Sequence, residues 1–272
     1  MHTSSIESCA INSANSVSDA RFVNLEQHIE SPIIASVCEH TAQQFSMKVA
    51  NQPSDRKQAF QLCHDVYCRA GLISGEQRGL RVMRQHLADT TNVLIAQSLD
   101  EVVFTVSLVG DGEFGLPMQS LFGEEVGRMR AAGLHLAEVS CLASSIDPDQ
   151  KRLRFQTLVS MISLLIQSAR RRGVDRLLLA VHPKHAKAYQ RLFGCVPCSD
   201  VKSYAAVSGN PAVLCMHDFA QLDVTRYPLY DQVYGPQYAP WQLDGANMLA
   251  SEKLFYEQFL PAEEYQVVPV AA

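Results

Sequence analysis

The strongest hydrophobic pattern in the chain runs from residue 134 to residue 194 and predicts four consecutive elements. Residues 136–143 form a predicted apolar strand that carries one carboxylate, and a basic turn leads from it into a long apolar helix that ends at residues 170–173. Residues 176–181 form a second predicted strand, and a short helix then continues to Gly194. This β-α-β-α order predicts two adjacent parallel strands with crossover helices.

Patterns on both sides of this stretch predict the rest of a domain. Helical spacing of apolar residues after Ser54-Asp55 predicts a helix that ends at Gly71. Further predicted elements are a hairpin with strands at 92–98 and 102–109, a polar helix or turn at 121–133, strands at 201–207 and 212–216, and an amphipathic helix at 247–260. We therefore predict an α/β (α+β) fold. It has one mixed, twisted sheet of six to eight strands, with the first helix and the crossover helix on opposite faces.

The composition changes twice along the chain and predicts three parts. Residues 1–47 are polar with scattered apolar positions, which predicts a mobile or loosely docked N-terminal arm. Residues 48–218 hold the predicted elements of the main domain. Residues 219–272 are rich in Tyr and Pro, and we expect this C-terminal tail and its helix to pack on the domain.

Charge and cysteine usage exclude several classes of protein. The 272 residues carry a formal net charge of -5, without the basic excess that nucleic-acid binders usually show. The eight cysteines have irregular spacing, and the N-terminus lacks a basic-then-apolar signal pattern, so we expect reduced thiols in the cytoplasm. The longest apolar run, residues 158–166, falls far short of the roughly 20 residues of a membrane span. We expect no transmembrane segment.

Several short motifs, in their order along the chain, resemble a known family. They are Val66-Tyr67, Gly115-Leu116-Pro117, Ala137-Glu138-Val139-Ser140, His182-Pro183 and a Tyr on the next helix. Between residues 56 and 216 the chain resembles the N-acyl amino acid synthases, which are similar to the acyl-homoserine-lactone synthases and, more distantly, to the GNAT acyltransferases. The resemblance implies a GNAT-like N-acyltransferase domain over residues 48–218.

The implied reaction transfers a fatty acyl group from the thioester of acyl carrier protein to the amino group of an amino acid. The donor is the phosphopantetheine arm of the carrier protein, and neither a permanently bound cofactor nor a metal is implied. A V-shaped opening between the strands of Glu138 and Leu178 would admit that arm. A non-catalytic module that binds an acyl chain or the carrier protein on the same fold is the alternative.

Glu138 and Tyr189 are the candidate catalytic residues. Glu138 is a lone carboxylate in an apolar strand, where burial raises the pKa of a carboxyl group toward that of a useful base. The resemblance assigns it the catalytic position, although a strand-end Glu can also simply face solvent. Tyr189 follows His182 by seven residues, where GNAT enzymes place a Tyr that can protonate the leaving sulfur. Packing alone is the other interpretation of Tyr189.

The turn before the long helix bears on the acyl donor. Coenzyme A-dependent GNAT enzymes cradle pyrophosphate on a glycine-containing loop, and here Leu153 and Phe155 stand in place of the glycines. The cations Lys151, Arg152 and Arg154 instead suit the single phosphate of a phosphopantetheine arm and an acidic carrier-protein surface. A solvated basic turn is the alternative interpretation.

Other residues are candidates for binding the acyl group or the acceptor. The candidates for binding the acyl chain and pantetheine also include Ser140, Cys141, Phe155 and Leu158, and the last two could line a long-chain tunnel together with Met161. The candidates for binding the acceptor are Tyr67, Arg69 and Arg84, of which the two arginines could clamp a carboxylate.

The chain departs from the family at three positions where the lactone synthases carry arginine. Cys63, Ser107 and Cys141 occupy these positions, and of the acidic residues expected before the first hairpin strand only Asp89 is nearby. Either the acceptor differs, another residue substitutes, or activity has been lost.

Two further cysteine arrangements are weak candidates for chemistry. Cys195 and Cys198 form a CxxC that Cys215 and His217 could complete as a zinc site, although no second CxxC supports it. Cys141 could act as a nucleophile, but the sequence places no His to activate it.

Overall fold

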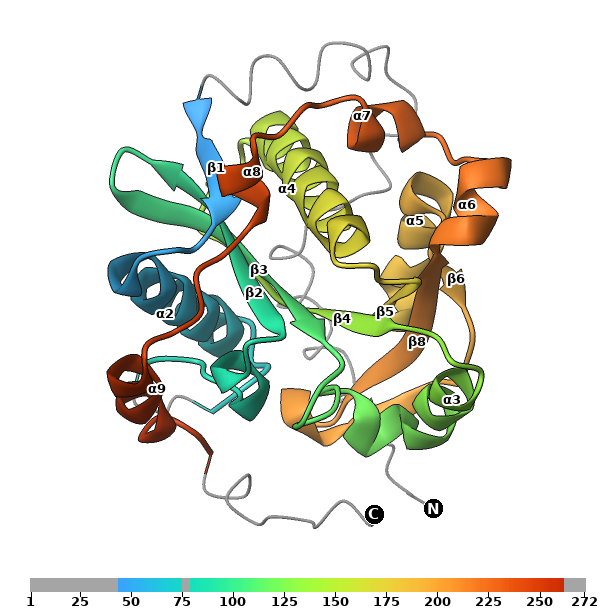
Figure 1. Cartoon of the computed structure of the whole chain (residues 1–272), viewed down its shortest axis with the longest axis horizontal. Helices are drawn as coiled ribbons and strands as arrows, with labels where there is room; N and C mark the ends of the chain where they lie inside the picture. Colours follow the sequence, from blue (N-terminus) through green and yellow to red (C-terminus); the bar gives the residue numbers. More distant parts are fainter. Residues whose placement is uncertain (1–43, 75–78, 262–272) are drawn as a thin grey trace, which may run out of the picture.

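The computed structural model describes residues 44–74 and 79–261 (Figure 1). Most of the predicted N-terminal arm, residues 75–78 of the basic turn and residues 262–272 of the tail lie outside the described residues. The strands are β1 (Ser46–Val49), β2 (Thr91–Ser98), β3 (Glu101–Gly110), β4 (Leu136–Ser144), β5 (Arg176–Val181), β6 (Val196–Pro197), β7 (Lys202–Tyr204) and β8 (Asn210–Asp218). The helices are α2 (Pro53–Arg69), α3 (Gln119–Ala131), α4 (Lys151–Arg171), α5 (Pro183–Phe193), α6 (Phe219–Thr225), α7 (Tyr230–Tyr234), α8 (Pro240–Leu243) and α9 (Ala250–Glu257), with 3-10 turns η3 (Arg84–Leu87) and η4 (Ala205–Val207).

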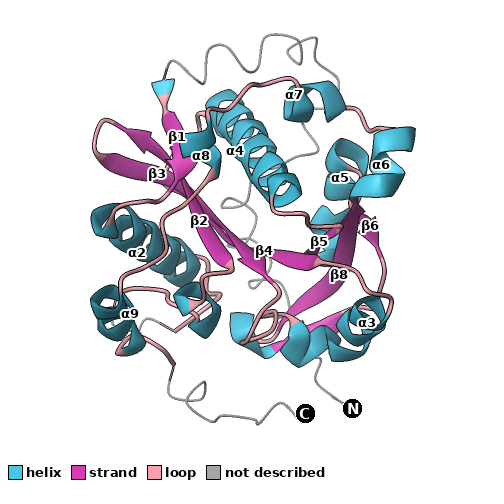
Figure 2. Ribbon diagram, in the orientation of Figure 1, coloured by secondary structure: helices cyan, strands magenta, loops and turns pink. Residues whose placement is uncertain are grey.

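The strands form one mixed sheet of eight strands, as the sequence pattern predicts. Their order is β1-β2-β3-β4-β5-β8-β6 (Figure 2). In addition, β7 pairs with β8 outside this path. The pair β4 and β5 is parallel and every other pair is antiparallel. The parallel pair arises because α4 is a crossover helix that returns the chain to the same end of the sheet.

The predicted opening in the sheet lies between β4 and β5. These strands pair only at Leu136 with Arg176, Ala137 with Leu177, and Glu138 with Leu178. Beyond Glu138 the two strands diverge, and residues 139–144 of β4 have no partner on β5. The sheet is therefore closed at the base of this strand pair and open above it.

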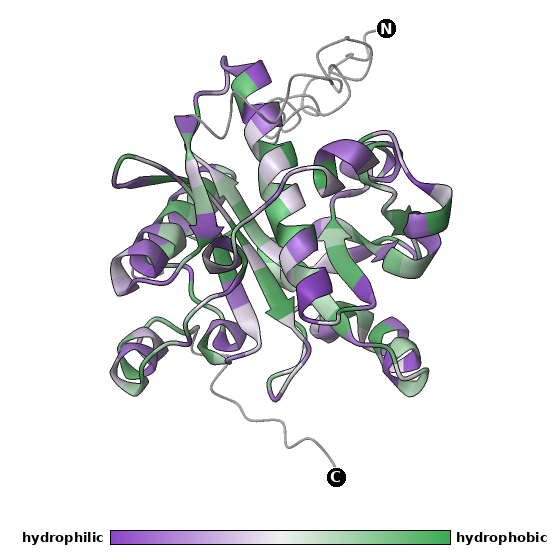
Figure 3. Cartoon of the chain, turned by 45° about the horizontal axis from the view of Figure 1, so that its top comes forward, coloured by the Kyte–Doolittle hydropathy of each residue, from purple (hydrophilic) through white to green (hydrophobic). Residues whose placement is uncertain are grey.

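The two predicted helices cover opposite faces of the sheet. One buried cluster joins α4 residues such as Leu158 and Ile162 to Leu94 of β2, while a second joins Phe60 and Cys63 of α2 to the other face. The crossover helix is buried on all sides along residues 154–166, and Figure 3 shows hydrophobic colouring along the middle of α4 and on the central strands. The fold therefore has a helix-sheet-helix layering.

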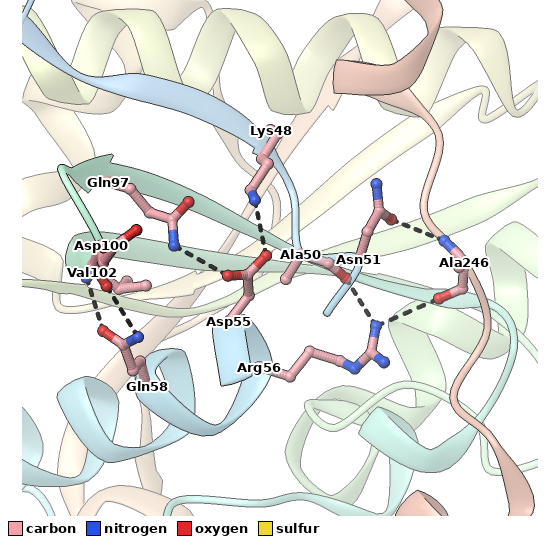
Figure 4. A network of polar contacts seen from close by, with 10 residues as sticks. All are labelled: Lys48, Ala50, Asn51, Asp55, Arg56, Gln58, Gln97, Asp100, Val102 and Ala246. Atoms are coloured by element: carbon pink, nitrogen blue, oxygen red, sulfur yellow. Dashed lines mark hydrogen bonds and ion pairs between the residues drawn. The ribbon is translucent and has the colours of Figure 1, made fainter. Parts of the chain in front are cut away.

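The C-terminal segment packs on the domain, as far as residue 261. Gln167 of α4 donates a hydrogen bond from Nε2 to the carbonyl oxygen of Val233 in α7 (2.9 Å). Arg56 of α2 forms two hydrogen bonds of 2.6 Å with the Glu252 carboxylate in α9, and both side chains are buried. The Arg56 guanidinium also donates to the carbonyl oxygen of Ala50 (2.8 Å), beside the Lys48–Asp55 ion pair shown in Figure 4.

Three predicted elements differ from the observed ones. The composition assigns Ser46 and Met47 to the arm, but they belong to β1 and pair with β2. The prediction missed this strand because a single apolar alternation of four residues is too short to predict one. The strand predicted at 201–207 is limited to β7, after which η4 turns the chain. The last sheet strand is longer than predicted and spans Asn210–Asp218.

Candidate active site

A cavity of about 2840 Å³ extends around the opening between β4 and β5. It brings six of the predicted site residues to one surface. They are Tyr67, Arg84, Glu138, Ser140, Cys141 and Tyr189. The strand ends and the loops between the β strands and helices line this cavity, which is where open α/β sheets place their ligand sites.

Glu138 lies at the last position of β4 that pairs with β5, with 2% of its surface exposed. Its Oε2 atom accepts a hydrogen bond of 2.8 Å from the backbone N–H of Met118, the residue before α3. Burial raises the pKa of Glu138 to about 8, although the hydrogen bonds from Met118 and Ser140 oppose the shift. A carboxyl group with this pKa can take up and release protons near neutral pH.

A β-bulge follows Glu138 in β4. Ser140 pairs with Ser107 and Ala143 with Thr105, so Cys141 and Leu142 face a single residue of β3. Cys141 has a left-handed φ of 53°, which is uncommon for a residue with a side chain. Since residues 139–144 lack a partner on β5, backbone N–H groups on this edge are available to a ligand in the opening. Such groups can stabilise an oxyanion.

Tyr189 reaches the cavity from α5 on the other side of the opening. His182 caps this helix, because its Nδ1 atom accepts a hydrogen bond from the backbone N–H of Lys184 (3.3 Å), and Pro183 takes the first helical position. Tyr189 is half-buried, and burial raises the pKa of its hydroxyl group. The hydroxyl therefore stays protonated and can donate a hydrogen bond at neutral pH.

The three positions at which the lactone synthases carry arginine lie together on the α2 face. The Cys63 and Cys141 thiols share a hydrogen bond, and the Ser107 hydroxyl lies 3.1 Å from His86 Nε2. The backbone N–H of Met83 donates to His86 Nδ1 (3.0 Å), which leaves the proton of the neutral ring on Nε2. His86 is a buried polar residue that the sequence analysis missed, since no motif marks it.

Only one of the two arginines of the predicted carboxylate clamp lines the cavity. Arg84 lines the cavity with its guanidinium 4.8 Å from the centre of the Phe114 ring. Arg69 is exposed at the end of α2 and is not among the residues that line the cavity. Two further cavity residues, Arg81 and Tyr204, have no motif around them and were not predicted.

Several residues that were predicted to bind the acyl donor lie in the first turns of α4. Lys151 and Arg152 are exposed, whereas Arg154 is buried, with a pKa lowered by that burial. Phe155 and Leu158 lie in the core cluster beneath α4 and do not line the cavity, while Ile162 one turn later does. The basic surface at this helix start therefore consists of two cations.

The CxxC cysteines do not form a metal site in the described part of the chain. No group of three or more His, Cys, Asp or Glu side chains within residues 44–74 and 79–261 is placed to hold a metal ion. His217 donates from Nδ1 to the carbonyl oxygen of Phe193 (2.8 Å), and burial raises the pKa of the Cys195 thiol. The six described cysteines are all free thiols.

No helix within residues 44–74 and 79–261 combines the length and the apolar content that crossing a membrane requires.

Comparisons with known proteins identify a family, and they find solved structures to which the chain is similar. A family model described as N-acyl amino acid synthase FeeM matches residues 58–218, which is more than half of the chain. Among solved structures, the chain is similar to FeeM, an N-acyl amino acid synthase from uncultured soil microbes. The TM-score is 0.55 and the identity 20%, over 68% of this chain and 96% of that chain. No curated protein matches the chain.

Two other solved structures have a similar arrangement of elements. BjaI, a CoA-dependent acyl-homoserine lactone synthase solved with MTA, has a TM-score of 0.47 and 15% identity over 79% of this chain and 99% of that chain. An acyl-CoA N-acyltransferase from Pseudomonas aeruginosa has a TM-score of 0.42 and 14% identity over 64% of this chain and 98% of that chain. The mixed sheet with helices on both faces is a GNAT-like acyltransferase fold. Since the family model covers both strands of the opening and the helix between them, this chain belongs to the N-acyl amino acid synthase family of FeeM and is an acyltransferase.

Proposed function

We propose that this acyltransferase moves a long-chain fatty acyl group from the phosphopantetheine thioester of acyl carrier protein to the amino group of an amino acid. The observation that carries the proposal is Glu138, a buried carboxyl group with a pKa of about 8 beside a gap in the sheet. Amide formation from an ammonium group needs a proton acceptor at this point, and the gap gives the thioester access to it.

Glu138 accepts the first proton. The acceptor enters as an ammonium ion, which has no lone pair for attack, and transfers a proton to the ionised Glu138 carboxylate. The free amine then attacks the thioester carbonyl carbon, and a nitrogen–carbon bond forms. Backbone N–H groups at the unpaired edge of β4 hydrogen-bond to the oxyanion that develops on the carbonyl oxygen.

Tyr189 acts on the leaving sulfur. As the tetrahedral intermediate collapses, the carbon–sulfur bond breaks and the sulfur takes up the second proton of the nitrogen. The Tyr189 hydroxyl donates a hydrogen bond to the developing thiolate. Because burial raises the pKa of this hydroxyl, it acts as a hydrogen-bond donor and keeps its own proton.

Two features at the start of α4 support a carrier-protein donor. Leu153 and Phe155 stand where a pyrophosphate cradle needs glycines, and the Phe155 side chain fills the core there. The exposed Lys151 and Arg152 can attract an acidic carrier protein and one phosphate. We therefore propose that Lys151 and Arg152 contact the carrier protein and that the buried Arg154 does not.

The size and lining of the cavity support a long acyl chain. Its volume of about 2840 Å³ exceeds the roughly 300–1,000 Å³ of ordinary small-molecule sites. On the α4 side it is lined by apolar residues, which are Val139, Leu142, Ile162, Leu179 and Val181. An alkyl chain placed along these side chains would gain about 0.8 kcal/mol for each CH₂ group removed from water.

The proposal is tested by product analysis with the purified full-length chain. Carrier proteins loaded with acyl chains of several lengths, and the matching acyl-coenzyme A thioesters, are each incubated with a panel of the twenty amino acids. Mass spectrometry should detect N-acyl amino acids, with faster turnover from the carrier-protein donor. Equal turnover with both donors would remove the carrier-protein assignment. Binding of acyl carrier protein without any N-acylated product, from any amine, would instead support the non-catalytic module.

A further inference from the structure

Arg81 is a cavity-lining cation without a carboxylate partner in the described structure. Its guanidinium lies 4.9 Å from the centre of the Tyr67 ring, and its Nε atom is buried and has no hydrogen-bond partner among the described residues. Its Nη2 atom donates one long hydrogen bond of 3.5 Å to the carbonyl oxygen of Ala206, and the Cys141 thiol is a further hydrogen-bonding neighbour of the guanidinium. The hydrogen-bonding capacity of this guanidinium is therefore largely unused.

Two other arginines of the cavity have strong polar partners within the protein. Arg130 forms a two-point ion pair with Asp111, with distances of 2.6 and 2.7 Å. Arg172 donates a hydrogen bond of 2.7 Å to the carbonyl oxygen of Thr90. No Asp or Glu of the described chain forms an ion pair with Arg81. The ionisable groups that act on its charge are the Cys141 and Cys63 thiols and the Tyr67 hydroxyl.

Arg81 belongs to the same part of the cavity as Glu138. Cys141 acts electrostatically on both side chains, and both side chains in turn act on the hydroxyl group of Tyr204, a further cavity residue. Cys141 also lies on the same face of β4 as Glu138, since the bulge shifts the alternation of side chains. Arg81 and Glu138 therefore flank one site on the α2 side of the sheet.

We propose that Arg81, stacked on Tyr67, binds the α-carboxylate of the acceptor and thereby restricts the enzyme to amines that carry a carboxylate. The inference rests on the proposed function and deepens it by naming the group that the acceptor site recognises. Guanidinium N–H bonds lie in the plane of the group, so stacking on one face leaves the edges for a two-point contact with a planar carboxylate. In an α-amino acid the ammonium group is one carbon away from the carboxylate, which directs it toward Glu138.

The local electrostatics favour an anion at this position. The pKa of the Cys141 thiol is lowered, first by the hydrogen bond from Cys63 and further by His86 and the positive charge of Arg81. The positive charge of Arg81, which favours the Cys141 thiolate, would equally favour a bound carboxylate, and no Asp or Glu of the described residues supplies a carboxylate beside Arg81.

The test compares each amino acid with its carboxamide, which keeps the amine and loses the negative charge. Wild type, Arg81→Gln, Arg81→Lys and the exposed control Arg128→Gln are assayed as full-length chains with an acyl donor. Binding of the same twenty amino acids and their carboxamides is also titrated by calorimetry without a donor. Thermal melting of each variant controls for folding.

We expect wild type to prefer the free acid over the amide. Arg81→Gln should raise KM for the acid about 10- to 150-fold, the range of a charge-assisted hydrogen bond, with kcat within a few-fold and little change for the amide. The preference for the acid should therefore disappear in Arg81→Gln, remain in part in Arg81→Lys, and persist in Arg128→Gln. A purely structural role of Arg81 would lower turnover of both substrates together.

The possible failures can be told apart. An unchanged acid-to-amide ratio in Arg81→Gln, in turnover or in binding, would overturn the role of Arg81 and leave the acyltransfer to amino acids standing. Wild type that binds acids and amides equally would overturn it as well. Binding of acids that depends on Arg81, without formation of any N-acyl product, would support the anion site and contradict the proposed function.

Discussion

At the scale of single residues, the proposed role of Glu138 as the base is tested by one substitution. Glu138→Gln keeps the shape of the side chain and removes the base, so kcat should fall about 100- to 10,000-fold. Binding of acyl carrier protein should stay within a few-fold of wild type, as measured by titration, because the proposed contacts with the donor lie on α4. Full activity in the Gln variant would exclude Glu138 as the base, and loss of folding would identify it as a structural carboxylate.

The raised pKa of Glu138 also predicts a pH dependence. Only the ionised carboxylate accepts a proton, so kcat/KM should rise with pH and level off above an inflection near pH 8. The residual activity of Glu138→Gln should lack this inflection and follow only the titration of the acceptor's ammonium group. The measurement is the rate of N-acyl product formation between pH 5.5 and 9.5 for both proteins. The same profile in both proteins would contradict the assignment.

The raised pKa of Glu138 also predicts that the stability of the fold falls as the pH rises, whereas activity should increase. Its folded pKa of about 8 lies above the unfolded value of 4.5, so the folded chain holds the proton more tightly and loses stability as the pH rises through this window. Denaturant titrations should show the free energy of unfolding of wild type falling relative to Glu138→Gln between pH 5 and pH 9. A difference of a few kcal/mol is expected. A constant difference between the two proteins would show that the carboxyl group is not buried.

Tyr189 should affect the leaving group and leave the acceptor site unchanged. Tyr189→Phe removes one hydrogen bond to a developing thiolate, which is worth roughly 10- to 150-fold in kcat. KM for the amino acid should stay within a few-fold, because the hydroxyl lies on the α5 side of the opening. Steady-state kinetics give both constants. An increase in KM at constant kcat would assign Tyr189 to acceptor binding instead.

At the scale of an element, the start of α4 should determine recognition of the donor protein. Reversing the charges of Lys151 and Arg152 should weaken binding of acyl carrier protein steeply at low salt and much less at high salt, because the Debye length is about 10 Å at 0.1 M. Lys57→Glu with Arg128→Glu is the matched control, since both cations are exposed on other helices. Binding titrations at two salt concentrations measure the effect. Equal weakening by the control pair would show a general charge effect.

At the scale of the whole molecule, the Arg56–Glu252 ion pair connects the first and last described helices. Glu252→Ala leaves a buried guanidinium without its carboxylate and should lower the free energy of unfolding by about 3–5 kcal/mol, measured by denaturant titration. Lys253→Ala on the same helix removes the more exposed Lys253–Asp89 pair and should cost less than about 1 kcal/mol. If Glu252→Ala lowered the free energy of unfolding by no more than Lys253→Ala does, α9 would contribute little to the core.

The sequence by itself determined the parts of this protein that depend on local patterns. The β-α-β-α order, the long apolar helix and the carboxylate of Glu138 within an apolar strand follow from periodicity and composition over short windows. The parallel pairing of β4 and β5 and the opening between them are confirmed. The roles of the predicted site residues remain proposals.

The tertiary structure alone decided which residues meet at the site. Met118 donates to Glu138 across 20 positions, and Arg81 reaches Tyr67 and the β4 bulge from a loop without a motif. Arg154 is buried although it stands beside exposed cations, because its position on α4 turns it toward the domain. Periodicity specifies which face of an element is apolar. It does not specify which polar side chains long-range packing brings together, and that depends on contacts between segments far apart in the chain.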